Sequence, residues 1–217
     1  MRCMRGRFPA GVAIFIAVWT GSVLRSRERR FCTWKGASIS SETPESGIDL
    51  RIAISSADYD VARTLILEYA DWLGVDLAFQ GFDDEIGDLA RVYGPPAGRL
   101  FLAFDAAVPM GCVGLRPLAA QGEAEMKRLF VRPEFRGRGV AGRLVRAVID
   151  AARRNGVGTL RLDTWPPRMA QADSMYRRLG FVPTPPYYNN PVMEVVFYAL
   201  ALDRSPSTQE SGGGGPC

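Results

Sequence analysis

The sequence predicts a single mixed α/β domain in residues 47–204 of a 217-residue chain. From Ile48 to Leu202, short alternating or apolar segments typical of strands are interleaved with amphipathic segments typical of helices. In the centre, Glu125–Asn155 reads as a strand, a glycine-rich turn and a long helix in direct succession. The flanks, residues 1–46 and 205–217, have a different composition. The sequence therefore predicts one domain with a tail at each end.

The N-terminal flank has clustered arginines on both sides of the uncharged run Phe8–Leu24. This is the layout of a signal peptide or a marginal membrane span, although the run is short for spanning a bilayer. We expect residues 1–46 to be a dispensable extension, or not native coding sequence, with a membrane anchor as the second interpretation. The tail 205–217 contains four consecutive glycines and is expected to be disordered.

Charge and residue usage exclude several classes of function. The net charge is +4, but residues 1–46 account for +5, so the predicted domain is nearly neutral and no nucleic-acid partner is expected. The chain has no histidine, which excludes a Ser-His-Asp triad, a Cys-His dyad and histidine-ligated metals. The four cysteines lack zinc-site spacing, so no metal is expected.

The first half of the domain predicts a strand, two helices and a hairpin. Ile48–Ile54 alternates between apolar and polar residues, as in a half-buried strand. Ser55 and its neighbours can cap a helix that continues to Leu73. Phe82–Tyr93 has the pattern of a second helix, which the following Gly-Pro-Pro ends. Arg99–Asp105 and Val108–Leu115 are predicted to pair as a hairpin.

The second half predicts two more strand–helix units and a last strand. Glu123–Val131 is a strand, and the helix from Val140 to about Asn155 buries residues at helical spacing. Thr159–Asp163 is a strand and Met169–Leu179 a helix that Gly180 ends. The remaining segments are a rigid loop and a final strand, Pro183–Pro191 and Val192–Leu202.

The turn before the long helix has the properties of a diphosphate cradle. Its sequence is Arg136-Gly137-Arg138-Gly139-Val140-Ala141. Glycines let the backbone turn sharply and approach a ligand, and the first amides of a helix are free to bind an anion. Two guanidinium groups add bidentate donors for phosphate oxygens. The alternative is an ordinary tight turn with solvated arginines.

This R-x-x-G-x-A order, after a strand that ends in Leu129-Phe130-Val131, resembles the acyl-CoA-binding motif of the GNAT acyltransferases. The segment from Tyr176 to Gly180-Phe181 resembles the family's Y-x-x-x-G-F segment. The spacing is neither that of a dinucleotide-binding fingerprint nor that of a P-loop. The resemblance implies the GNAT fold, a mostly antiparallel central sheet of six to seven strands flanked by about four helices.

The resemblance also implies roles for individual residues. The backbone of Leu129, Phe130 and Val131 is expected to bind the pantetheine arm of acetyl-CoA, and the cradle residues Arg136 to Ala141 its diphosphate. Tyr176 corresponds to the tyrosine that protonates the leaving thiolate in relatives. An asparagine seven residues before this tyrosine contacts the arm in many relatives, and here Met169 stands in its place.

A general base and an acceptor site follow less directly. Glu123 and Glu125 share one side of their strand, where relatives often place the carboxylate that takes the amine proton, and Glu125 is the preferred candidate. Tyr187, Tyr188 and Asn189 are candidates to line the acceptor end. Asp83-Asp84-Glu85 would attract a cationic amine, or simply favour a helix N-terminus.

The sequence therefore predicts a cytoplasmic N-acetyltransferase. It would move acetyl from acetyl-CoA to a primary amine, on a small molecule or a peptide, by direct attack in a ternary complex. Dimers are frequent in the family. Two alternatives remain open, a non-catalytic acyl-CoA sensor with the same fold and a membrane-tethered interaction domain built around the first segment.

Overall fold

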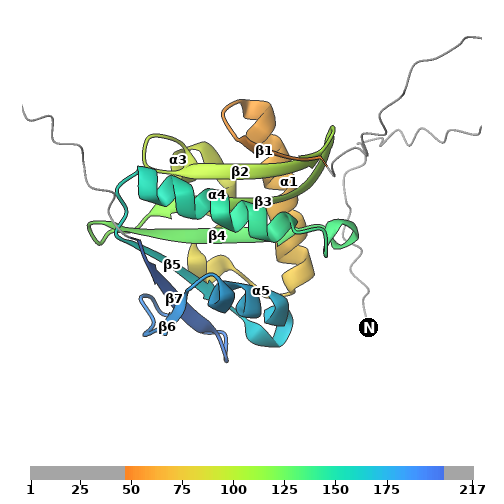
Figure 1. Ribbon diagram of the computed structural model, residues 1–217. Helices are drawn as coiled ribbons and strands as arrows, with labels where there is room; N and C mark the ends of the chain where they lie inside the picture. The colour runs from red at the N-terminus through yellow and green to blue at the C-terminus, as the bar shows by residue number, and fades with distance from the viewer. Residues whose placement is uncertain (1–46, 203–217) are drawn as a thin grey trace, which may run out of the picture. The chain divides into compact units, whose positions relative to one another are not determined.

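The computed structural model describes residues 47–202, which form a mixed α/β unit (Figure 1). The expectations for residues 1–46 and for the C-terminal tail lie outside these described residues. In chain order the elements are β1 (Ile48–Ile52), α1 (Ser56–Leu73), η1 (Ala78–Gln80), α2 (Phe82–Gly87), α3 (Leu89–Tyr93), β2 (Arg99–Asp105), β3 (Val108–Pro117), β4 (Glu123–Val131), η2 (Pro133–Phe135), α4 (Val140–Arg154), β5 (Thr159–Thr164), α5 (Pro166–Arg178), β6 (Val182–Thr184) and β7 (Val196–Ala201).

The seven strands form one sheet in the order β1-β2-β3-β4-β5-β7-β6. Five of its six neighbouring pairs are antiparallel, which confirms the predicted fold class, and only β4 and β5 are parallel. The crossover between these two is α4, as parallel neighbours require a long connection. The expected hairpin forms between β2 and β3, with Asp105 opposite Val108.

The parallel pair β4–β5 is joined along only a short part of its length. Glu123, Ala124 and Glu125 pair with Thr159, Leu160 and Arg161, and the pairing then stops. From Met126 onward β4 continues beside β3 alone. The two halves of the sheet therefore diverge at this point, and the divergence creates space between them.

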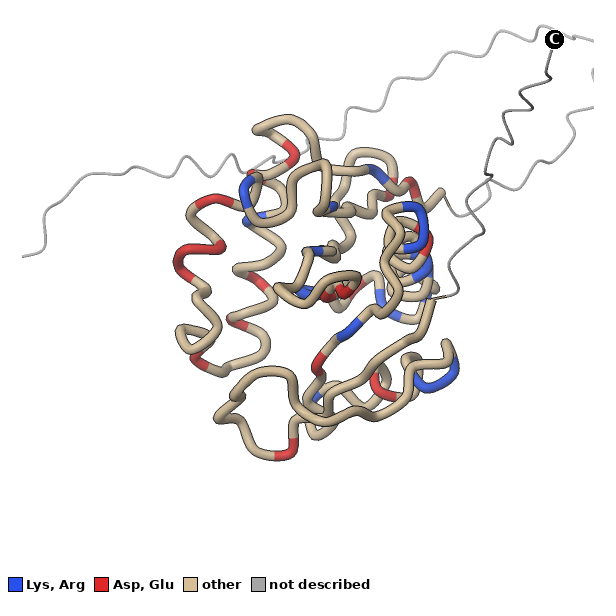
Figure 2. The backbone as a smooth tube through the Cα atoms, turned by 90° about the vertical axis from the view of Figure 1, so that its left-hand side faces the viewer, with Lys and Arg blue, Asp and Glu red and all other residues tan. Residues whose placement is uncertain are grey.

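Helices cover both faces of the sheet (Figures 1 and 2). α4 and α5 lie on one face, where a large apolar cluster includes Leu144, Val148 and Leu160. α1 and α3 lie on the other, around a cluster that includes Leu65, Leu102 and Phe130. The tube in Figure 2 shows acidic positions along α1 and basic positions along α4. The predicted cradle thus directly precedes the helix that carries these basic positions.

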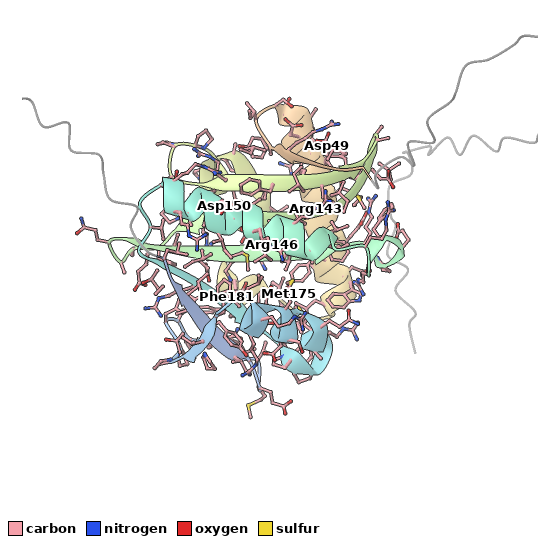
Figure 3. All side chains as sticks on the ribbon, in the orientation of Figure 1. Asp49, Arg143, Arg146, Asp150, Met175 and Phe181 are labelled. Carbon is pink, nitrogen blue, oxygen red and sulfur yellow. The ribbon has the colours of Figure 1, made fainter. Side chains whose placement is uncertain are left out.

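The two longest helices follow directly from their sequences. Ser55 and Asp58 form a capping box at the start of α1, and Gly74 ends it in the left-handed conformation. α4 buries its apolar stripe against β2, β3 and β4. Figure 3 shows Arg143, Arg146 and Asp150 on the opposite, exposed side of α4. No helix within residues 47–202 is both long and apolar enough to cross a membrane.

Several predicted elements differ from the structure, apart from shifts of one or two residues at strand ends. Phe82–Tyr93 is two short helices, because the backbone of Asp88 leaves the helical region (φ −147°, ψ 74°) and its side chain caps α3. α5 includes a first turn from Pro166, but Met169 has a non-helical backbone (φ −125°, ψ 39°) and kinks it, so the main part of the helix begins near the predicted Met169. Part of the predicted loop is the edge strand β6, and the last strand begins only at Val196.

Candidate active site

A pocket occupies the divergence between β4 and β5. β4 contributes Met126, Lys127 and Leu129 to its wall. β5 contributes Asp163 and Thr164, and α5 contributes Tyr176. Further lining residues come from the segment around η1 and from the loop before β7, namely Leu77, Phe79, Gln80, Asn190, Val192 and Val195. The pocket is therefore open to residues from both halves of the sheet.

A bulge in β4 shapes the pocket. The register between β3 and β4 shifts between Cys112 and Gly114, and Arg128 has a positive φ of 58°. A non-glycine residue in this region is uncommon and requires support from its surroundings. The support comes from Glu85 of α2, which accepts two hydrogen bonds of 2.8 Å from the Arg128 guanidinium. Both side chains are 3% exposed.

Glu85 therefore has a structural partner and is not a free acid for attracting an amine. Its carboxylate also accepts a 2.7 Å hydrogen bond from the Tyr93 hydroxyl. Burial opposes ionisation of Glu85, but the hydrogen bonds and charge of Arg128 outweigh burial and lower the Glu85 pKa. Asp83 and Asp84, in contrast, lie in the first turn of α2, where acidic residues favour the helix N-terminus.

The start of α4 has the form expected of an anion cradle. Gly137 and Gly139 have φ values of 78° and 80°, which L-residues with side chains rarely adopt. A Cβ atom at either position would meet nothing within 4 Å, so the space beside the turn is open. Among the described residues, no acceptor is paired with the amides of Val140, Ala141 and Gly142, whereas that of Arg143 bonds to Gly139. Three amide donors thus point out of the helix end.

The two cradle arginines precede these amides in the chain, and each already has a partner. Arg136 donates to the carbonyl of Val131 at 3.0 Å, and its guanidinium lies over the ring of Trp72. Arg138 forms a 2.8 Å ion pair with Asp105, with both side chains more than one-third exposed. An exposed pair of this kind contributes little free energy, so Arg138 can exchange Asp105 for a phosphate at small cost.

Tyr176 is a buried residue of α5. It is 5% exposed, lines the pocket, and packs its ring edge-on against Phe181. Within residues 47–202 its hydroxyl has no hydrogen-bond partner in the protein. Burial raises the pKa of this phenol, so it remains protonated at neutral pH. A protonated hydroxyl in the pocket is what the predicted general acid requires.

Glu125 occupies a different environment from that expected of a strand-end carboxylate. It is 1% exposed and does not line the pocket. Arg116 contacts one carboxylate oxygen at 2.7 Å, and the Tyr187 hydroxyl donates to the other at 2.6 Å. Its partner candidate Glu123 is bonded to Arg161. The structure thus holds both carboxylates in ion pairs.

The three predicted acceptor residues lie in the loop before β7 but do not line the pocket. Tyr187 contacts Glu125, and Tyr188 stacks edge-on against Tyr187 while its hydroxyl accepts from Gln80 and Asn190. Asn189 is exposed. The next residue, Asn190, lines the pocket instead. The sequence did not single out Asn190, the residue of this loop that follows the three candidates and lines the pocket.

Sequence analysis also missed polar groups at the end of β5. Among the described residues, the Thr164 hydroxyl and the Trp165 indole N–H are buried side-chain polar groups without a partner, and both residues line the pocket. Asp163 and Lys127, on opposite sides of the divergence, are 3.6 Å apart. Only the strand pattern of Thr159–Asp163 was visible in the sequence, and it does not reveal which side chain faces a pocket.

The fold has a parallel strand pair that α4 connects and that parts after three residue pairs, with Tyr176 in the wall of the pocket between the strands. This arrangement agrees with the acyl-CoA N-acyltransferase class of fold that the sequence predicted. The model of the acetyltransferase (GNAT) family matches residues 66–181. An uncharacterized N-acetyltransferase of Schizosaccharomyces pombe is 37% identical over 160 residues, covering 73% of this chain and 98% of the relative. The chain belongs to the GNAT family of acetyltransferases.

Solved structures agree at the level of the fold. A GNAT acetyltransferase of Staphylococcus aureus superposes with a TM-score of 0.60 at 18% identity, covering 72% of this chain and 100% of its own. An acetyltransferase of Salmonella typhimurium, whose structure contains its cofactor acetyl-CoA, superposes with a TM-score of 0.52 at 20% identity. The match covers 74% of this chain and 96% of the Salmonella chain.

Proposed function

We propose that this chain transfers the acetyl group of acetyl-CoA to a primary amine by direct attack in a ternary complex. The observation that supports this most directly is the pocket between β4 and β5, which has Tyr176 in its wall and belongs to the strand pair that α4 connects. The same residues fit acetyl-CoA. The free amides of Val140, Ala141 and Gly142 would receive its diphosphate, together with Arg136 and Arg138.

The pantetheine arm would lie along the unpaired edge of β4, at Leu129, Phe130 and Val131. The unpartnered Thr164 and Trp165 groups give this part of the pocket a hydroxyl and an N–H for the arm's amides. A bound thioester supplies an activated acetyl carbon. The protein's part is to hold that carbon beside the amine, to exclude water and to move protons.

Tyr176 would donate a proton to the leaving thiolate. Its unpartnered hydroxyl in the pocket supports this role. Glu125, which the sequence suggested as the proton acceptor for the amine, is paired with Arg116 and lies outside the pocket lining, so no proton transfer is assigned to it. Since the acetyl donor is made inside the cell, the enzyme is proposed to act in the cytoplasm.

The test of this function is ligand-dependent stability followed by an acceptor screen. Acetyl-CoA at about 100 times its Kd should add about 2.7 kcal/mol to the free energy of unfolding. Gly142→Asp places a negative charge at the free amides without a backbone conflict, because a Cβ there meets only Arg146 at 3.5 Å. We expect this variant to weaken acetyl-CoA binding at least tenfold, although the charge favours the helix end itself.

Gly142→Asn is the matched neutral control and should bind nearly as the parent does. A parent protein that shows no stabilisation by acetyl-CoA would refute the proposal. Stabilisation without thiol release in the presence of any primary amine would favour the non-catalytic sensor instead.

A further inference from the structure

The pocket contains a carboxylate that the sequence did not single out. Asp163 lies at the end of β5, lines the pocket and is 16% exposed. Its donors are the Lys127 ammonium at 3.6 Å and the Asn190 amide at 3.4 Å, both long contacts, and the Tyr188 hydroxyl. A carboxylate offers about four lone-pair positions, so Asp163 retains one that can accept a hydrogen bond from a ligand.

Glu125, in contrast to Asp163, is fully buried and closely held by its partners. Its oxygens receive contacts of 2.6 to 2.8 Å from Tyr187 and Arg116, and the side chain is 1% exposed. A proton on Glu125 would have to displace one of these partners and would leave Arg116 without its counter-charge. The two carboxylates therefore differ in access to the pocket and in how closely their partners hold them, and both differences favour Asp163.

Lys127 connects the two acids and fixes the charge balance. Its ammonium is 3.7 Å from Glu125 and 3.6 Å from Asp163, and it donates a 3.0 Å hydrogen bond to Gln80. With Arg116 neutralising Glu125, Lys127 is the counter-charge of Asp163. Burial lowers the pKa of Lys127, although Asp163 and Glu125 act against that shift. An incoming ammonium group would compete with Lys127 for Asp163.

The remaining wall of the pocket indicates what the amine is attached to. Leu77 just before η1, Phe79 within it, and Val192 and Val195 before β7 belong to the same lining. Burying an apolar body against these four residues is favourable.

We propose that Asp163 accepts the proton of the acceptor ammonium, and that the acceptor is a primary amine on an apolar body. This rests on the proposed acetyl transfer. R–NH₃⁺ gives its first proton to Asp163, which later releases it to solvent. The nitrogen lone pair forms the C–N bond to the acetyl carbon. As the C–S bond breaks, Tyr176 protonates the thiolate and regains a proton from the nitrogen.

Other titratable groups near Asp163 could also contribute to the pH dependence of kcat/KM. Lys127 and Glu125 face it from β4, and the phenols that sense its charge are Tyr69 on α1, Tyr176 on α5, and Tyr187 and Tyr188 in the loop. Each of these phenols has a raised pKa, chiefly from burial, and stays protonated through neutral pH. Lys127 is present in all variants compared below.

The experiment measures kcat/KM for 2-phenylethylamine between about pH 6 and 9 in the parent, Asp163→Asn and Glu125→Gln. The parent and Glu125→Gln should show a plateau over this range. Asp163→Asn should lose about 100-fold at pH 7 and recover about tenfold per pH unit, because only amine already neutral in solution then reacts. With hydroxylamine, which is largely unprotonated at pH 7, the same variant should stay within about threefold of the parent.

A structural defect in Asp163→Asn would lower kcat/KM equally for both acceptors. Thermal shift with acetyl-CoA tests separately whether the variant is folded and binds its cofactor. Parallel pH profiles for Asp163→Asn and the parent would overturn the assignment, as would a sloping profile in Glu125→Gln. If the parent acetylates other primary amines but not 2-phenylethylamine, the proposed acceptor class is wrong while the acetyltransferase function stands. If the parent acetylates none, both fall.

Discussion

The buried pair Glu85–Arg128 permits a sharp test of how the pocket is held open. Glu85→Gln and Arg128→Met each leave one buried group without its charged partner. Because both side chains are 3% exposed and joined by two 2.8 Å hydrogen bonds, each single change should cost about 3–5 kcal/mol of unfolding free energy. For a domain of this size that corresponds to roughly 6–20 °C in Tm.

The double variant Glu85→Gln/Arg128→Met should cost much less than the sum of the two single changes, because neither charge is left unpaired. Urea and thermal unfolding of the four proteins complete the cycle. The matched control is the more exposed pair Arg63–Asp60, at a similar distance of 2.7 Å, where Asp60→Asn should cost at most about 0.5 kcal/mol. Additive costs for Glu85 and Arg128, or single costs as small as that of Asp60→Asn, would refute the reasoning.

Two further predictions concern the acid and the pH dependence of stability. Tyr176→Phe should lower kcat about 100-fold with little change in the KM for acetyl-CoA, since the ring and its contact with Phe181 remain. Steady-state kinetics with free-thiol detection measure both constants. An unchanged kcat would contradict the general-acid role. Since the pKa of Glu85 is lowered on folding, its stabilisation is present above about pH 4.5 and is lost as the pH falls through the lower, folded pKa. Urea unfolding below pH 4.5 should therefore show a steeper loss in the parent than in Glu85→Gln/Arg128→Met, and equal slopes would exclude Glu85 as a source of acid sensitivity.

The parts of the fold that sequence predicted are those with a strong local pattern. β4 was expected at Glu123–Val131 and has these bounds, and α4 follows the predicted periodicity of Val140, Leu144 and Val148. The left-handed glycines of the cradle were also foreseeable, because few other residues tolerate that backbone. Local rules therefore sufficed where the residue type itself restricts the conformation.

The site's electrostatics could not be predicted in this way. Nothing in the sequence marks Arg128 as a residue with positive φ, since its bulge depends on Glu85, distant in the chain. Similarly, Glu125 resembled an available base until Arg116, across the β3–β4 ladder, was seen to neutralise it. Asp163 gains its position from Lys127 on the other strand of the divergence. These properties arise from tertiary pairing, which a one-dimensional pattern does not contain.

The short pairing of β4 with β5 has a consequence for how the domain opens. Two ladders, β1–β4 and β5-β7-β6, share one continuous sheet, yet only three residue pairs join them. Few interstrand hydrogen bonds need to break for one ladder to move against the other, so this seam should separate at a lower free energy than either ladder unfolds. Amide hydrogen exchange would then reveal two cooperative units, although residues 47–202 belong to one compact unit. The boundary between the two would run through the middle of the sheet. A ligand lying in the seam would bridge the two units and bring their exchange rates together.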